Sequence, residues 1–261
     1  MAPPAALSER ELAGRRAVVT GGGRGIGRAT ALRLASLGAD VAVIARTQSE
    51  LDEAAAAARG LGVRGLAVRA DLTGLGACRE ALGTAARELG GLEILVNNAG
   101  WTLTSGFLEE DEAYWRRVVD ENLWTTVFCT RVALEWMAGH DGGVIVNVAS
   151  DAGRVGTAGE AIYSAAKGGV IALTRSLARE MARHQVRVNC VCPGPTDTAV
   201  LHENQRDPAQ AGKIDRMIKM IPLRRVARPE EIADAVAFFC TDASRYVTGQ
   251  VLSISGGLVM A

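Results

Sequence analysis

The chain has 261 residues, 48% of them hydrophobic, and its 29 basic residues balance its 29 acidic residues. This length allows a sizeable core and fits one large α/β domain as well as two small ones. The absence of a basic excess or a basic stripe argues against a nucleic-acid-binding protein. Five cysteines without a C-x-x-C pair and three scattered histidines favour neither a disulfide framework nor a metal site.

The chain begins with "MAPPAALSERELAG", which we interpret as a flexible tail over 1–14. This stretch lacks the basic start and the long apolar run of a signal peptide. No run of 18 apolar residues predicts a membrane-spanning helix. We therefore expect a cytoplasmic protein with no membrane partner.

From residue 16 onward, short apolar runs rich in valine and isoleucine alternate with longer helical patterns. Because strands that are apolar on both faces need helices above and below them, the alternation is typical of a parallel sheet. It predicts a doubly wound (Rossmann) α/β fold, with a seven-stranded parallel sheet, helices on both faces and a single domain over 15–261. Strands are predicted at 16–20, 40–45, 65–70, 92–97, 143–149, 186–192 and 250–255. Helical patterns reach about Leu37 after the first strand and then cover 49–61, 78–90, 109–138, 160–183 and 229–241.

One late segment departs from this alternation. Residues 199–228 combine prolines with mixed charge and follow the sixth predicted strand. Since ligands bind at the carboxyl ends of the strands in such sheets, we expect an inserted loop and helix here that covers the substrate.

The stretch "TGGGRGIG" at 20–27 directly follows the first predicted strand and opens the first helix. Its glycines permit a tight turn, and the free N–H groups of a helix N-terminus attract a pyrophosphate. The spacing is T-G-x-x-x-G-x-G and not G-x-G-x-x-G, so the position after the first strand carries more weight than the motif. A flexible turn without a ligand is the alternative.

Tyr163 and Lys167 in "AIYSAAKGG" are four residues apart and lie on one face of a helix. They are either a phenol packed beside a cation or an acid and the charge that tunes it. A cation at roughly 4 Å is worth about three pKa units to a tyrosine whose ordinary pKa is about 10. Ser150 directly follows the fifth predicted strand, where its hydroxyl can donate to the same substrate oxygen. Together with the phosphate loop, this favours Tyr163 as a general acid/base for a carbonyl group.

These motifs resemble, in order and separation, those of the short-chain dehydrogenase/reductase family over residues 15–259. The resemblance implies hydride transfer between a nicotinamide dinucleotide and a ketone or secondary alcohol. It also implies that Asn122 holds a water that links Lys167 to solvent; the alternative is a local helix kink with a backbone-bonded side chain. The matching motifs are "TGGGRGIG" at 20–27, "DL" at 71–72, "NNAG" at 97–100, "ENL" with Asn122, Ser150 after "VNVA", "YSAAK" at 163–167 and "CPGPTDT" at 192–198.

The same resemblance implies which residues contact the dinucleotide, from the phosphate loop through the adenine to the nicotinamide end. For the polar loop residues, capping of backbone groups is the alternative. The predicted contacts are Gly21, Arg24, Gly25, Ile26, Gly27, Arg46, Asp71, Leu72, Asn98, Ala99, Gly100, Tyr163, Lys167, Pro193, Gly194, Thr196 and Thr198.

The end of the second predicted strand, "VIAR", bears on the choice of dinucleotide. Ala45 stands where NAD-preferring relatives carry an acid, and Arg46 follows it. A guanidinium pairs with a 2′-phosphate through a charge-assisted fork, and Arg24 adds a second cation. We therefore expect NADP, with NAD possible; a solvated arginine at the strand exit is the alternative.

The predicted substrate contacts are Trp101, Ser150, Ala152, Arg154 and Glu160. Trp101 offers a flat apolar wall, although a core or interface tryptophan is the alternative. The small residues in "SDAGRVGTAGE" leave room for a ring or a branched group. Glu160 is either a substrate contact or an acid that stabilises the start of its helix.

We therefore interpret the chain as a ketoreductase of a cyclic or β-ketoacyl substrate, which is a thioester of CoA or a carrier protein or a polyketide-like compound. Several stretches also resemble alicyclic hydroxyacyl-CoA dehydrogenases, so an NAD-dependent enzyme of that kind is one alternative. A non-catalytic, dinucleotide-binding regulatory module is another. The resemblance implies a homotetramer, in line with the symmetric assembly of most oligomers.

Overall fold

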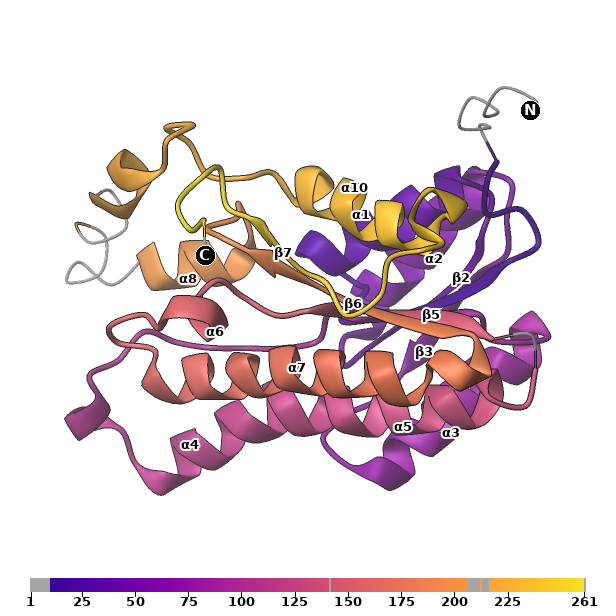
Figure 1. Ribbon diagram of the computed structural model, residues 1–261, viewed down its shortest axis with the longest axis horizontal. Helices are drawn as coiled ribbons and strands as arrows, with labels where there is room; N and C mark the ends of the chain where they lie inside the picture. Colours follow the sequence, from indigo (N-terminus) through magenta and orange to yellow (C-terminus); the bar gives the residue numbers. More distant parts are fainter. Residues whose placement is uncertain (1–9, 141, 206–211, 213–215, 261) are drawn as a thin grey trace.

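The computed structural model of the chain describes residues 10–140, 142–205, 212 and 216–260. One sheet dominates it, with seven strands in the order β3-β2-β1-β4-β5-β6-β7, and every neighbouring pair is parallel (Figure 1). This order confirms the predicted α/β fold with a seven-stranded parallel sheet. The strands are β1 Arg16–Thr20, β2 Asp40–Ala45, β3 Gly65–Arg69, β4 Ile94–Asn97, β5 Gly143–Val148, β6 Val186–Pro193 and β7 Val251–Ile254.

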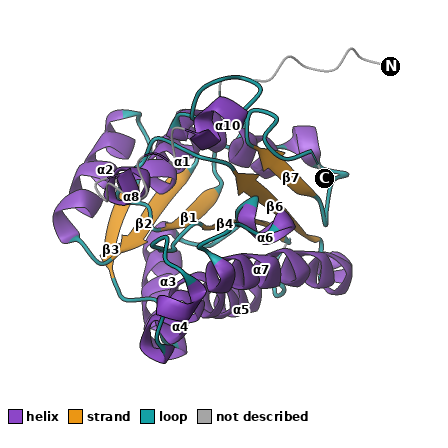
Figure 2. Cartoon of the chain, turned by 90° about the vertical axis from the view of Figure 1, so that its left-hand side faces the viewer, coloured by secondary structure: helices purple, strands orange, loops and turns teal. Residues whose placement is uncertain are grey.

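Helices cover both faces of the sheet (Figure 2). One face carries α1 Gly25–Ser36, α2 Gln48–Gly60 and α10 Pro229–Cys240. The other carries α3 Leu75–Leu89, α5 Thr125–Met137 and α7 Ala161–Glu180. Three shorter helices are α4 Glu112–Val119, α6 Ala152–Val155 and α8 Ala199–Gln205. Among the described residues, no helix has the length and apolar composition needed to cross a membrane.

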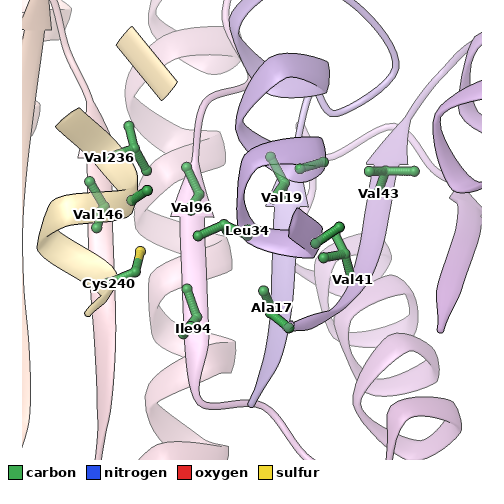
Figure 3. Close-up of a cluster of buried hydrophobic side chains, with 14 of the residues drawn as sticks. Ala17, Val19, Leu34, Val41, Val43, Ile94, Val96, Val146, Val236 and Cys240 are labelled. Atoms are coloured by element: carbon green, nitrogen blue, oxygen red, sulfur yellow. The ribbon is translucent and has the colours of Figure 1, made fainter. Parts of the chain in front are cut away.

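The alternating side chains of β1 show why the strands are apolar throughout. Ala17 and Val19 point to the α1 side, where Leu34 lies over them and over Val96 of the neighbouring strand (Figure 3). Val18 points to the opposite side, toward α3 and α5. Successive residues of a strand face opposite sides of the sheet, so both sets are buried and both stabilise the fold.

The predicted helical region 109–138 is divided at its middle. A π-helical turn, Asp120–Trp124, separates α4 from α5 and contains Asn122. Such turns insert an extra residue and often occur at functional sites. Asn122 is fully buried at this point.

The predicted flexible tail extends too far into the chain. Its residues 1–9 lie outside the described residues, but Leu12 is only 2% exposed and packs with the α1 core. The N–H of Leu12 also donates to the carbonyl oxygen of Leu37 at 2.8 Å. Burial of an apolar side chain and a backbone hydrogen bond hold 10–14 against the domain, so the prediction was wrong for these residues.

The predicted covering segment 199–228 is described in part. It contains α8 and a helical stretch at 216–220, whereas 206–211 and 213–215 lie outside the described residues. Figure 1 shows α8 and α6 toward the same end of the molecule, and the view in Figure 2 shows them apart, with α8 nearer α2 and α6 nearer α7. That the segment covers a substrate stays a prediction.

Candidate active site

A cavity of about 590 Å³ lies at the carboxyl edge of the sheet. The loops that follow β1 to β6 each contribute to its wall, which is the usual place for a ligand in an open parallel sheet. Residues far apart in the sequence, such as Gly21, Asp71 and Tyr163, therefore line one space. With the exceptions of Gly27 and Arg154, all the predicted cofactor and substrate residues line it.

The glycine loop between β1 and α1 forms one end of the cavity. Gly21 and Gly25 have positive φ angles of 64° and 53°, which side-chain-bearing residues rarely adopt. Gly27 lies beneath the loop, because a Cβ added there would be 2.1 Å from the carbonyl oxygen of Gly21. Gly27 therefore allows α1 to approach the loop closely. It does not line the cavity, although the sequence analysis predicted that it contacts the dinucleotide.

The loop after β4 fixes the shape of the glycine loop. The Nδ2 atom of Asn98 donates to the carbonyl oxygens of Thr20 and Gly21 at 3.1 and 3.2 Å. In return, the Thr20 hydroxyl accepts hydrogen bonds from the N–H groups of Asn98 and Ala99 at 3.0 and 3.1 Å. Asn98 thus both lines the cavity and binds the two loops together.

The two arginines expected near a 2′-phosphate both contact carboxylates. Arg46 pairs with Glu121 at 3.2 Å, and Arg24 lies 3.9 Å from Glu50. Both acids line the cavity, and the sequence analysis missed both. Nearby, hydrogen bonds from Thr73 lower the pKa of Asp71, so this carboxyl is charged at neutral pH.

Ser150, Tyr163 and Lys167 come together at the reactive end of the cavity. The hydroxyl group of Ser150 lies close to that of Tyr163 and acts to lower its pKa. Lys167 is 4% exposed, and its Nζ donates to the carbonyl oxygen of Val148 at 3.0 Å. The same Nζ lies 5.7 Å from the centre of the Tyr163 ring. The sequence spacing had predicted this proximity.

The pKa of Tyr163 is raised in this structure, whereas the sequence analysis expected Lys167 to lower it. Burial is the main cause, and the neighbouring carboxylate of Glu160 adds to it. The nearby Ser150 hydroxyl acts in the opposite direction. Lys167 is buried as well, which lowers its own pKa to about 8.

Asn122 occupies the π-helical turn with one side-chain atom bonded and the other free. Its Nδ2 donates to the carbonyl oxygens of Trp101 and Val118 at 2.6 and 2.8 Å. Its Oδ1 is buried and has no hydrogen-bond partner among the described residues. A Cβ added at Gly100 would lie 2.6 Å from this Oδ1 and 3.3 Å from Lys167 Nζ. The glycine therefore leaves open the space that the two polar atoms share.

The loop after β6 places Pro193, Gly194, Thr196 and Thr198 along the cavity. The Thr196 hydroxyl donates to Gly194 at 3.0 Å, and the Thr198 hydroxyl donates to Thr196 at 3.3 Å. These hydrogen bonds to backbone carbonyl oxygens are the kind expected if the threonines only cap the loop. Both threonines also line the cavity, so capping the loop does not exclude contact with a cofactor.

At the substrate end, Trp101, Ala152 and Glu160 line the cavity as predicted. Arg117 stacks over the Trp101 ring at 3.6 Å, and Tyr114 meets it edge-on at 5.9 Å. The sequence analysis did not single out the apolar and small polar residues that complete this wall. These are Thr102, Thr104, Thr157, Ala158, Val200, Leu201, Met217 and Leu258.

Arg154 is not among the residues that line the cavity, and its contact with a substrate stays a prediction. Its Nη1 donates to the Ser253 hydroxyl of β7 at 2.6 Å. Ser253 in turn donates to the buried carboxylate of Asp151. The short helix α6 turns the arginine toward β7, where it stabilises this pair.

Glu160 gives the site a pH-dependent effect on stability. Burial alone raises its pKa from 4.5 to about 7. Because the folded state holds this proton more tightly than the unfolded state, stability falls as the pH rises from about 4.5 to 7. We expect Glu160→Gln to be more stable than the parent by roughly 1 to 3 kcal/mol at pH 8 and to lose this advantage near pH 4.5.

Urea unfolding at both pH values measures this difference. Glu53→Gln, on the exposed side of α2, serves as the control and should change little at either pH. If Glu160→Gln raised the free energy of unfolding equally at pH 8 and pH 4.5, Glu160 would not titrate in this range.

A glycine loop before the first helix and a Ser/Tyr/Lys group at the same edge of a parallel sheet are typical of dinucleotide-dependent oxidoreductases. The model of a protein family described as enoyl-(acyl carrier protein) reductase matches residues 21–259. The chain belongs to the short-chain dehydrogenase/reductase family, as its motifs predicted. Its members use NAD(P), and the chain is a dehydrogenase/reductase acting on a CH–OH group.

Individual relatives agree with this assignment. The chain is 43% identical to a cis-4-hydroxycyclohexanecarboxylate dehydrogenase of Sinomonas cyclohexanicum over 93% of its own length and 96% of the relative's. It is 37% identical to a 3-oxoacyl-[acyl-carrier-protein] reductase of Synechocystis over 94% and 96%. A solved structure from Sinorhizobium meliloti 1021, described as a short-chain alcohol dehydrogenase, superposes with a TM-score of 0.91 at 40% identity, covering 96% of this chain and 98% of that one.

Proposed function

We propose that the chain reduces a cyclic or β-ketoacyl ketone to a secondary alcohol, with NADPH as the preferred hydride donor. The observation that carries this proposal is that Ser150 and Tyr163 meet at the cavity, with Lys167 one helical turn away. A hydroxyl pair at that place can hold one carbonyl oxygen from two directions. A protein that only sensed the dinucleotide would not need it.

The described residues fit a dinucleotide. Helix α1 begins at Gly25 without a side-chain cap, and its first turn contains no acidic residue. Its N–H groups and its dipole are therefore available to a pyrophosphate. The cavity runs from this loop to Tyr163, and a bound nicotinamide supplies or accepts the hydride.

The roles of the polar side chains follow from their surroundings. Ser150 and Tyr163 donate hydrogen bonds to the carbonyl oxygen, and Tyr163 then gives up its proton. Its raised pKa keeps this hydroxyl protonated at neutral pH, which suits a proton donor. We propose that Lys167 and the unpaired Oδ1 of Asn122 hold a water that returns the proton from solvent.

The wall of the cavity supports a substrate with an apolar body. Trp101, Leu201, Met217 and Leu258 offer apolar surface around the reactive end. The two named relatives act on a hydroxycyclohexanecarboxylate and on an oxoacyl group carried by a protein. We carry both over as candidate substrate classes, a CoA thioester being the soluble analogue of the second. We also propose a homotetramer.

A direct assay tests the proposal. The purified chain is incubated with NADPH or NADH and with 4-oxocyclohexanecarboxylate, acetoacetyl-CoA or acetoacetyl-carrier protein, and the absorbance of the reduced nicotinamide is followed. We expect oxidation with at least one ketone, and faster oxidation of NADPH than of NADH. Tight dinucleotide binding without oxidation by any of these ketones would favour the non-catalytic module.

A further inference from the structure

A single carboxylate holds the arginine that faces the adenosine end of the cavity. Arg46 contacts both carboxylate oxygens of Glu121, with Nη1 3.2 Å from Oε1 and Nη2 3.4 Å from Oε2. The arginine is exposed, whereas the glutamate side chain is 11% exposed. The carboxylate is therefore the fixed member of the pair and the guanidinium the movable one.

The fork of Arg46 is the same set of donors that a 2′-phosphate would need. A guanidinium binds a carboxylate or a phosphate through two parallel N–H···O bonds, so it binds one of them at a time in this way. The second cation of this region, Arg24, also faces an acid, Glu50, at 3.9 Å. Together with Asp71, three carboxylates and two arginines line this end of the cavity.

Glu121 has a second partner that makes an exchange feasible. The Nε atom of Arg117, one turn earlier on α4, donates to its Oε1 at 2.9 Å. If Arg46 turns to a phosphate, Glu121 keeps Arg117 and no buried carboxylate is left unpaired. If no phosphate is present, Arg46 stays on Glu121 and is not left as a lone cation beside a ribose hydroxyl.

We propose that Glu121 is a specificity-determining residue for the cofactor, which competes with the 2′-phosphate of NADP for Arg46. By this competition it narrows the difference in affinity between NADP and NAD, so that one site accepts both. The inference rests on the proposed dinucleotide site, but it does not depend on the identity of the ketone.

The test is the affinity of Glu121→Gln for the two reduced dinucleotides. Dissociation constants for NADPH and NADH are measured by protein fluorescence at low ionic strength, where surface charges are least screened. We expect the variant to bind NADPH about fivefold more tightly and NADH within about twofold of the parent, in keeping with the modest strength of exposed ion pairs. The amide oxygen of glutamine can still accept from Arg117, so the turn keeps one of its bonds.

The chain contains a matched control in Glu135. Its carboxylate accepts from both terminal nitrogens of Arg79 at 3.0 Å and from Nε of Arg131 at 2.9 Å. This is the arrangement of Glu121, but it lies on α5 outside the cavity lining within the described chain. Glu135→Gln should leave both dissociation constants unchanged.

A double variant completes the experiment. In an Arg46→Gln background, Glu121→Gln should no longer tighten NADPH binding, because the arginine for which Glu121 and the 2′-phosphate compete is absent. The inference would be overturned if Glu121→Gln alone did not increase the ratio of NADPH affinity to NADH affinity. It would also be overturned if Glu121→Gln tightened NADPH binding by the same factor in the Arg46→Gln background. A parent protein that binds neither dinucleotide would overturn the proposed function itself, whereas binding without ketone reduction would affect only the catalytic part of it.

Discussion

Replacing Tyr163 with phenylalanine is expected to lower turnover by about 10³-fold, within the range by which general acid catalysis accelerates reactions. The hydroxyl is the only part of the side chain that is lost, and with it the proposed proton donor and the contact with Ser150. The ring remains in place, so dinucleotide binding should change little. The measurements are kcat with the best ketone and the dissociation constant for NADPH.

A second tyrosine provides the control for this variant. Tyr246 is fully exposed, and Tyr246→Phe should retain the activity of the parent. Thermal unfolding of both variants shows whether any loss of activity comes from loss of fold. Residual turnover of Tyr163→Phe within tenfold of the parent would exclude Tyr163 as the proton donor.

Replacing Gly27 with alanine is expected to weaken dinucleotide binding by about 10- to 100-fold, since overpacking of this kind costs about 1 to 3 kcal/mol. The added Cβ would lie 2.1 Å from the Gly21 carbonyl oxygen and 2.5 Å from Asn98 Nδ2. Neither atom can withdraw easily, because the two are bonded to each other at 3.2 Å. The glycine loop must therefore move away from α1, which lowers the melting temperature and disturbs the pyrophosphate site together.

Gly76 supplies the matched control on another helix. It lies in α3, and a Cβ added there meets nothing within 4 Å. Gly76→Ala should leave binding unchanged and stabilise the protein by up to about 1 kcal/mol, because alanine is the better helix former. Unchanged NADPH affinity and melting temperature in Gly27→Ala would show that the loop is less constrained than its contacts indicate.

The periodicity of apolar residues and the spacing of the motifs were sufficient to predict the fold and the residues at the centre of the site. The apolar runs of the seven strands are buried on both faces, so each appears in the sequence as a continuous run, and the structure confirms all seven within two residues at either end. Tyr163 and Lys167 were placed together by helical geometry alone. The position of Ser150 after β5 brought it to the same edge of the sheet.

Interactions between distant segments were beyond this kind of prediction. The pairing of Arg46 with Glu121 joins residues 75 positions apart, and no pattern in the sequence links them. The bond of Arg154 to Ser253 was not foreseen either, because it depends on a four-residue helix that the sequence did not indicate. The raised pKa of Tyr163 depends on burial and on Glu160, neither of which the Tyr–Lys spacing reveals.

The strand order has a consequence for the nascent chain on the ribosome. β1 is hydrogen-bonded to β2 on one side and to β4 on the other. The ribosome therefore releases the glycine loop long before its second neighbour exists. The loop receives its bonds from Asn98 and Ala99 only after four strands have been synthesised. A chain that ends before β4 therefore leaves β1 without its second neighbour and lacks the four hydrogen bonds that fix the shape of the glycine loop.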